Sequence, residues 1–177
     1  MINIEDLIKN RVREVADFPK PGIVFKDITP ISMDPELSNE ILNYLVSTFT
    51  NKGITKIAGI ESRGFLFGYP LAMRLGVPFV MIRKQGKLPY QKKSYSYNLE
   101  YGSATIEMHT DAIHQGDNVL IHDDLLATGG SAQAAAELIA SCGGNIFGFN
   151  FLINLSFLDG SQKLNSYTEN IVNLATY

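Results

Sequence analysis

Two adjacent carboxylates followed by a short glycine-rich turn form the most chemically suggestive stretch of this 177-residue sequence. Asp123 and Asp124 follow the apolar run 119–121, which predicts a buried strand that ends before the acids. The turn Ala127-Thr-Gly-Gly-Ser131 then leads into a helix-forming run, and the start of a helix offers unpaired N–H groups and partial positive charge to an anion. Each half alone also fits a solvated turn or a helix-capping loop. Joined without a gap, they predict a site for a ribose 5-phosphate, with the diol on the acids and the phosphate on the turn.

A second strand, loop and helix follow the same plan earlier in the chain. The predicted strand 56–60 leads into Glu61-Ser-Arg-Gly64, where Arg63 can donate two hydrogen bonds to a phosphate group. Further on lies a cationic segment with no acid in it, whose charged members are Arg83, Lys84, Lys87, Lys92 and Lys93. This segment is either a solvated loop or a binding surface for an anionic ligand.

Hydrophobic spacing and capping signals predict the elements that hold these residues. Helices are expected at 4–15, from Pro35 with Asp34 as N-cap to a stop at Gly53, from the end of the 61–64 loop to a stop at Gly76, and at 132–140. Strands are expected at 56–60, 77–83, 104–108, 119–121 and 145–155. The prolines within 18–30 favour a rigid, partly extended loop, and the Tyr-rich stretch 86–102 favours a long loop or hairpin that can act as a lid. Strands interleaved with helices indicate an α/β fold with a mainly parallel sheet, whereas the tail 156–177 carries no interpretable motif.

Composition indicates a folded cytoplasmic protein. A hydrophobic share of 45% and a charged share of 19% predict a single domain, residues 1–177, with a sizeable core. The sequence has no apolar run near the roughly 18 residues of a membrane span, and its first residues do not resemble a secretion signal. The lone Cys142 cannot form an internal disulfide. The net charge of −3 argues against a nucleic-acid partner.

The run from Val119 to Ser131 resembles the signature of type I phosphoribosyltransferases. Its Asp-Asp-Leu-Leu-Ala-Thr-Gly-Gly form is similar to that of the adenine phosphoribosyltransferases. Three further segments, 18–30, 61–64 and 94–102, are similar to that family in the same order. The resemblance implies a mainly parallel twisted sheet flanked by helices, with a flexible catalytic loop.

For the base site, the residues alone leave Phe25 open as a core residue or as a stacking surface for a flat base. The resemblance implies that Phe25 stacks on adenine and that main-chain groups of Val24 and Lys26 read the purine edge. It also implies that Leu125 covers the other face of the base. The first 30 residues would then include a base-covering segment.

The resemblance also implies roles for the remaining candidates. Asp123 and Asp124 would hold the ribose, and the 5′-phosphate would lie against Ala127, Thr128, Gly129, Gly130 and Ser131. The diphosphate would be bound by Ser62, Arg63, Arg83, Lys84 and Lys87, beside a non-proline cis peptide at Glu61–Ser62. Glu100 and Tyr101 match catalytic positions, with Glu100 the candidate to handle the proton of the base.

The reaction implied by the resemblance joins adenine to 5-phospho-α-D-ribose 1-diphosphate, giving AMP and diphosphate. Mg²⁺ would be held mainly by substrate and water, and a homodimer is expected because some loop cations of this family reach the neighbouring site. Two alternatives remain, namely transfer to another base such as guanine or xanthine, and a non-catalytic regulator that binds phosphoribosyl ligands. His122 stands beside the acids, but strand alternation separates it from Asp123, which favours a structural histidine over a metal ligand.

Overall fold

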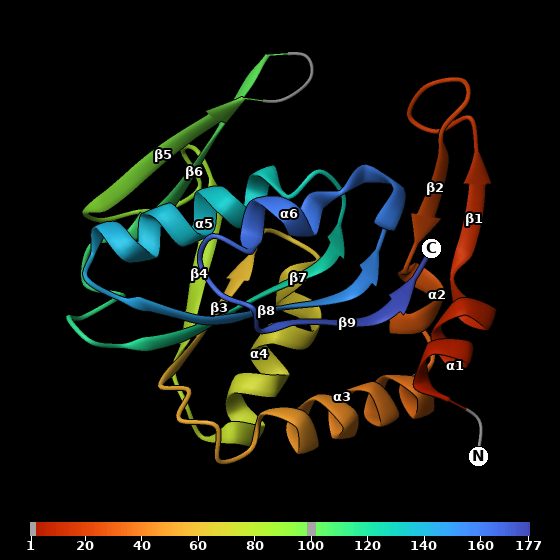
Figure 1. Cartoon of the computed structure of the whole chain (residues 1–177), viewed down its shortest axis with the longest axis horizontal. Helices are drawn as coiled ribbons and strands as arrows, with labels where there is room; N and C mark the ends of the chain where they lie inside the picture. Colours follow the sequence, from red (N-terminus) through yellow and green to blue (C-terminus); the bar gives the residue numbers. More distant parts are fainter. Residues whose placement is uncertain (1–2, 99–101) are drawn as a thin grey trace.

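A computed structural model describes residues 3–98 and 102–177 and centres on a seven-stranded twisted sheet (Figure 1). The strand order is β5-β6-β4-β3-β7-β8-β9. Their bounds are β3 Lys56–Ile60, β4 Phe79–Lys84, β5 Lys92–Asn98, β6 Ser103–His109, β7 Asn118–Leu126, β8 Asn145–Asn154 and β9 Ile171–Thr176. Neighbours from β4 through β3, β7 and β8 to β9 pair in parallel, whereas β6 is antiparallel to both β4 and β5. The predicted α/β fold with a mainly parallel sheet is therefore confirmed.

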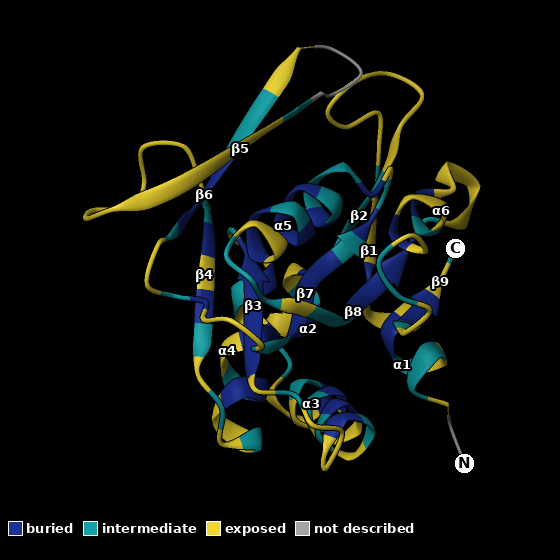
Figure 2. Ribbon diagram, turned by 60° about the vertical axis from the view of Figure 1, so that its left-hand side comes forward, coloured by how far each residue is buried: buried dark blue, intermediate teal, exposed yellow. Residues whose placement is uncertain are grey.

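Helices cover both faces of this sheet. They are α1 Ile4–Arg11, α2 Thr29–Ser32, α3 Pro35–Phe49, α4 Gly64–Leu75, α5 Gly130–Ser141, the 3₁₀ turn η1 Ser156–Leu158 and α6 Gly160–Leu164. Successive residues of β7 point to opposite faces, so Val119 and Ile121 pack with α5, while Leu120 packs with α1, α3 and α4. The strands at the centre of the sheet are consequently buried on both sides, as Figure 2 shows.

The N-terminal region differs from the sequence prediction. The helix predicted at 4–15 ends at Arg11, and residues Arg13–Ala16 form strand β1, which pairs antiparallel with β2, Val24–Asp27. Val15, whose spacing suggested a longer helix, instead lies opposite Phe25 in the β1–β2 pair. The rigid, partly extended loop predicted over 18–30 contains the extended strand β2, but regular helix was wrongly excluded from its end, since Pro30 lies in the first turn of α2, where a missing N–H is tolerated.

The segments after β4 and β8 also gain structure that the sequence left undefined. Of the stretch 86–102, residues 92–98 form β5, which pairs with β6, so its described part agrees with the hairpin that was one of the two alternatives. The tail without a motif forms α6 and the edge strand β9, which runs parallel to β8. Within the described residues, none of the helices has the length and apolar character that crossing a bilayer requires.

Candidate active site

The paired acids lie inside β7 and not beyond its end. The strand was predicted to stop before Asp123, but it continues to Leu126 because β8 provides partners for the added residues, with Asp123 opposite Phe151. Both acids are buried, and Asp123 Oδ1 accepts a hydrogen bond from the Asp124 N–H at 2.9 Å. Burial raises the pKa of Asp123 well above its ordinary value, and the neighbouring charge of Asp124 is the second largest cause of this rise. The pair is therefore a concentrated, poorly solvated acceptor that favours hydroxyl or cationic partners.

Arg63, at the start of α4, lies against these acids. Its Nε is 2.5 Å from Asp124 Oδ2, and its guanidinium carbon is 5.7 Å from the centre of the Phe25 ring. Burial alone would lower the pKa of Arg63, but the Asp124 and Asp123 carboxylates together raise it. One side chain thus joins the predicted diphosphate, ribose and base residues. The predicted cis peptide at Glu61–Ser62 is present.

Gly64 is what allows α4 to approach β7 so closely. A Cβ at this position would lie 2.8 Å from the His122 carbonyl oxygen and 3.1 Å from Asp123 Cα. These are backbone atoms that cannot move aside cheaply. The absence of a side chain at residue 64 therefore sets the distance between Arg63 and the acidic pair.

The glycine-rich turn encloses a cavity of about 140 Å³. Gly129 adopts φ +78°, a left-handed conformation that glycine permits, and α5 begins at the next residue. The cavity is lined by all five predicted phosphate residues, Ala127, Thr128, Gly129, Gly130 and Ser131, and by Tyr97, Leu125, Leu126, Ala132 and Phe151. Sequence reasoning missed Tyr97, which comes from β5. Only the concentration of tyrosines in 86–102 pointed toward it.

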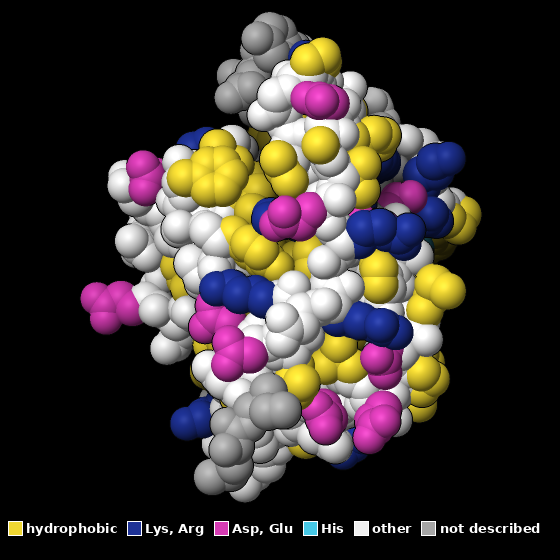
Figure 3. All heavy atoms as spheres, turned by 90° about the vertical axis from the view of Figure 1, so that its right-hand side faces the viewer, with side chains coloured by type: hydrophobic (Ala, Val, Ile, Leu, Met, Phe, Trp, Pro, Cys, Tyr) yellow, Lys and Arg dark blue, Asp and Glu magenta, His cyan; other side chains and the backbone are white. Residues whose placement is uncertain are grey.

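The segment that was predicted to cover the base forms the β1–β2 hairpin. Phe25 packs edge-on against Phe18 with ring centres 5.2 Å apart, while Val24 is half exposed. The Ile23 carbonyl turns toward β1, since it accepts from the Phe18 N–H at 3.3 Å. Main-chain groups alternate in direction along a paired strand, so those of Val24 and Lys26 face the edge away from β1. Figure 3 views this side of the molecule, where charged side chains alternate with apolar ones.

Glu61 binds the end of β4, where two of the predicted cations lie. Arg83 Nε lies 3.2 Å from Glu61 Oε2, and the Lys84 N–H donates to the same oxygen at 3.0 Å. Arg83 Nη1 also donates to the Lys87 carbonyl oxygen at 3.0 Å. Burial would raise the pKa of Glu61, but these donors lower it overall. Glu61, which sequence reasoning did not assign, therefore ties the cationic segment to the loop that carries Ser62 and Arg63.

The remaining candidates are the predicted catalytic residues, His122 and a possible metal site. Glu100 and Tyr101 lie outside the described residues. His122 is fully buried, its Nδ1 is 2.6 Å from Asn150 Oδ1, and burial lowers its pKa to about 4, which agrees with the predicted structural role. Within residues 3–98 and 102–177, no three His, Cys, Asp or Glu side chains gather as metal ligands would.

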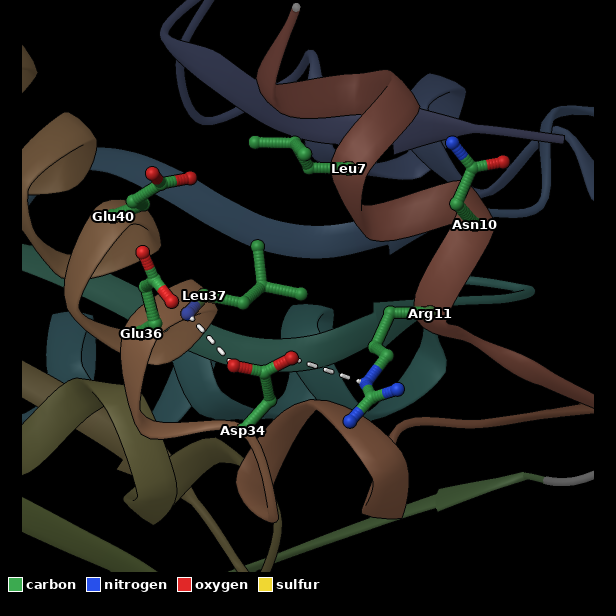
Figure 4. A pocket seen from close by; sticks show the side chains of 7 residues that line it. All are labelled: Leu7, Asn10, Arg11, Asp34, Glu36, Leu37 and Glu40. Atoms are coloured by element: carbon green, nitrogen blue, oxygen red, sulfur yellow. Dashed lines mark hydrogen bonds and ion pairs between the residues drawn. The ribbon is translucent and has the colours of Figure 1, made fainter.

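A larger cavity lies away from this chemistry, between α1 and α3. Its volume is about 320 Å³. Figure 4 shows Asp34 beside this cavity, where its carboxylate accepts a hydrogen bond from the Leu37 N–H and forms an ion pair with Arg11. Asp34 therefore acts as the predicted N-cap of α3. None of the predicted site residues lines this cavity, so cavity size does not locate the active site.

Comparison with known proteins shows the family of the chain. The family model described as phosphoribosyl transferase domain matches residues 35–169. A Nitrosococcus oceani adenine phosphoribosyltransferase is 50% identical over 161 residues, which cover 91% of this chain and 94% of that protein. The crystal structure of adenine phosphoribosyltransferase from Thermoanaerobacter pseudethanolicus has a TM-score of 0.93 at 48% identity, covering 97% of this chain and 99% of that one. The Saccharomyces cerevisiae enzyme, complexed with an imino-altritol bisphosphate and adenine, has a TM-score of 0.89 at 40% identity, covering 97% and 98% of the two chains. The chain belongs to the phosphoribosyltransferase family and, within it, to the adenine phosphoribosyltransferases.

Proposed function

We infer that the protein transfers the 5-phosphoribosyl group of 5-phospho-α-D-ribose 1-diphosphate to N9 of adenine, giving AMP and diphosphate. The observation that carries this proposal is the bridge made by Arg63, which pairs with Asp124 and lies over Phe25. It brings together groups suited to three parts of the reactants, namely a diphosphate, a sugar diol and a flat base. The phosphate-sized cavity of the turn follows directly along the chain from the acids.

In this proposal, Phe25 stacks on adenine and Leu125 covers its other face. The outward-facing main-chain groups of Val24 and Lys26 support reading of the purine edge. A 6-amino group donates to a backbone carbonyl, whereas a 6-oxo group would set two acceptors against each other and leave both unpaired. Adenine is therefore favoured over hypoxanthine.

The acidic pair binds the ribose hydroxyls and also serves the chemistry. As N9 attacks C1′ and the bond to diphosphate breaks, positive charge develops on the ribose ring. Asp123 and Asp124 stabilise that charge from a buried position, where electrostatic interactions are strong. Ribose hydroxyls that bind Asp124 compete with Arg63 for it, so donor binding frees Arg63 to face the diphosphate.

The leaving diphosphate needs positive charge. Arg63, Arg83, Lys84 and Lys87 supply it from the protein, and Glu61 joins the end of β4 to the loop that carries Arg63. Mg²⁺ prefers oxygen ligands and keeps several waters, which fits a site whose nearest acids are committed to the ribose. When bound with the donor, the metal supplies further charge neutralisation to the diphosphate oxygens.

Glu100 and Tyr101 are proposed to complete the site from the β5–β6 hairpin. Tyr97, which belongs to the same family-like segment 94–102, lines the cavity of the glycine-rich turn, and this supports a role for that segment in the reaction. Glu100 would take the proton of the base, a role worth about 10²–10⁴ in rate. If Glu100→Gln leaves kcat within a factor of two, Glu100 does not carry that proton.

The deciding assay mixes the protein with Mg²⁺, the phosphoribosyl donor and one base at a time, and follows nucleotide and diphosphate formation. Adenine is expected to give AMP, with hypoxanthine, guanine and xanthine far slower. Faster turnover of another base would move the assignment within the enzyme class. Donor binding without release of diphosphate for any base would instead favour a regulator.

We also propose that the protein is a homodimer and that each chain forms one domain. Leu66, Tyr69 and Met73 lie along one exposed side of α4, and Met81 of β4 is exposed as well. Tyr69 contacts Phe79, which points to the same side of β4 as Met81, so these residues form a continuous apolar surface of the kind that marks interaction sites. Arg83 continues that side of β4 toward the active site, which supports a subunit interface close to the diphosphate cations. Light scattering should give twice the mass of the chain, and Met73→Glu should reduce it to the monomer.

A further inference from the structure

The hairpin that carries the base-binding residues stands apart from the main sheet. Among the described residues, β1 and β2 pair only with each other in a two-stranded sheet, and Figure 1 draws them beside the seven strands. A stacking residue works only when its strand is held in place, since a displacement of about 1 Å can cost about 10²-fold in rate. The contacts between β2 and the body of the protein therefore bear on adenine binding.

Two cation–aromatic contacts make this connection. On one side of β2, Arg63 lies over the ring of Phe25. On the other side, Lys26 Nζ lies 4.0 Å from the ring centre of Tyr177, the residue that follows β9. Alternation along the strand separates the two, because Phe25 and Lys26 point to opposite faces. The Lys26–Tyr177 contact therefore does not occupy the face of Phe25 that is proposed to stack on adenine.

Tyr177 is itself firmly held. Its N–H donates to the Asn154 carbonyl at 2.9 Å, and its own carbonyl accepts from the Ser156 N–H at 2.9 Å and the Ser156 hydroxyl at 2.7 Å. Its ring also faces Lys9 of α1, whose Nζ lies 5.4 Å from the ring centre. The phenolic oxygen is buried and has no hydrogen-bond partner within the described part of the chain. The ring, and not the hydroxyl, therefore makes the connection.

Lys26 is placed to make this contact a strong one. Its side chain is only 11% exposed, and its ammonium also pairs with Glu14 across the hairpin. A cation over an aromatic ring is bound more tightly when water is excluded. The contact therefore joins both strands of the hairpin to the end of β8 through Tyr177.

We propose that Tyr177 is a positioning residue for adenine, which holds β2 through Lys26 so that Phe25 and the outward main-chain groups of β2 meet the base. The inference rests on the adenine role proposed above for β2. During the reaction, adenine takes the face of Phe25 and the diphosphate takes Arg63, so the Arg63–Phe25 contact is given up. The Lys26–Tyr177 contact involves neither ligand and persists, which makes it the anchor of the strand when the base is bound.

The test compares Tyr177→Ala with Tyr177→Phe. Alanine should raise the KM for adenine about tenfold, equivalent to about 1.4 kcal/mol, while the KM for the donor stays within twofold. Phenylalanine keeps the ring and loses only an unpartnered hydroxyl, so its KM for adenine should match the wild type. Leu174→Val is the matched control, because it trims a buried side chain of β9 whose hydrophobic cluster includes no described residue of β2. It should lower Tm and leave both KM values unchanged.

The result that would overturn the proposal is an equal rise in both KM values for Tyr177→Ala, or no rise in either. Phe25→Ala, measured in parallel, separates this failure from failure of the β2 assignment. If Phe25→Ala raises the KM for adenine and Tyr177→Ala does not, only the role of Tyr177 is wrong. If neither changes it, β2 is not the adenine site. Tyr177→Ala combined with Lys26→Met should be no worse than Tyr177→Ala alone, and additive losses would show that the two side chains act separately.

Discussion

Gly160 packs against the glycine-rich turn 127–131, and this contact allows a test of whether α6 holds the turn in place. Gly160 is buried at the start of α6, and a Cβ there would lie 2.2 Å from the Ala127 carbonyl oxygen and 3.0 Å from the Gly129 nitrogen. Both neighbours are main-chain atoms of the turn. Gly160→Ala must therefore push α6 and the turn apart, although residue 160 does not line the phosphate cavity.

The size of the effect follows from the distances. A carbon approaches a carbonyl oxygen to about 3.3 Å, so relief from 2.2 Å requires a shift of about 1 Å. A misplacement of about 1 Å in a binding site costs as much as about 10²-fold in rate. Overpacking a buried position also costs about 1–3 kcal/mol of stability. We therefore expect a 10- to 100-fold loss in kcat/KM for the donor, roughly 1.4–2.7 kcal/mol, with a clear fall in Tm.

Steady-state kinetics with the donor varied, together with calorimetric binding of AMP, measure this loss. Gly148→Ala is the control, because its Cβ would lie 2.7 Å from the Asn170 carbonyl oxygen, at the start of β8 and far from the turn. It should lower Tm to a similar degree and leave the KM for the donor unchanged. If Gly160→Ala behaves like Gly148→Ala, the turn does not depend on α6 and the reasoning is refuted.

Three further predictions follow from burial and charge. Asp123→Asn should abolish activity yet raise Tm at pH 7.5. The pKa of Asp123 is raised in the folded protein, so its buried charge costs stability as pH rises above the unfolded pKa of about 3.9. The gain in Tm is about 2–4 °C for each kcal/mol relieved, and a fall in Tm would contradict this prediction. Phe25→Ala should raise the KM for adenine more than the KM for the donor in steady-state assays, whereas equal changes would mean that Phe25 only packs against Phe18. His122 has a pKa lowered to about 4, so the fold should lose about 3 kcal/mol from this group as pH falls from about 6.5 to 4. His122→Gln does not titrate and should remove that part of the acid sensitivity in urea unfolding at pH 7.5 and 4.5, and parallel losses in both proteins would exclude His122 as its source.

Local signals predicted the elements that carry the chemistry. Asp34 caps α3 as its position before a proline predicted, and β3 spans the residues that its apolar run predicted. The glycine turn also lies between β7 and α5 as expected. Each of these features depends on neighbouring residues, through a cap, a conformational preference or a buried run. Such signals are present in the sequence itself.

The features that the sequence analysis did not predict depend on pairing with strands that are distant in the sequence. β7 extends through Asp123 because β8 pairs with it, and the stretch after Arg11 becomes a strand because β2 lies beside it. An apolar spacing that fits a helix fits a short strand equally well when a partner strand is available. Propensity alone could not choose between them.

The residues that support the site illustrate the same limit more strongly. Glu61 binds the β4 cations, Tyr97 lines the phosphate cavity, Gly160 supports the turn and Tyr177 reaches Lys26. Glu61 and Tyr97 lie in segments that the sequence singled out for other residues, whereas Gly160 and Tyr177 lie in the tail that carried no recognisable pattern. In a parallel α/β sheet the strand ends meet at one edge, so later elements of the chain come to lie against earlier loops. The motif therefore predicts which groups contact the substrate, whereas the proposed role of the tail is to hold the glycine-rich turn and β2 in place.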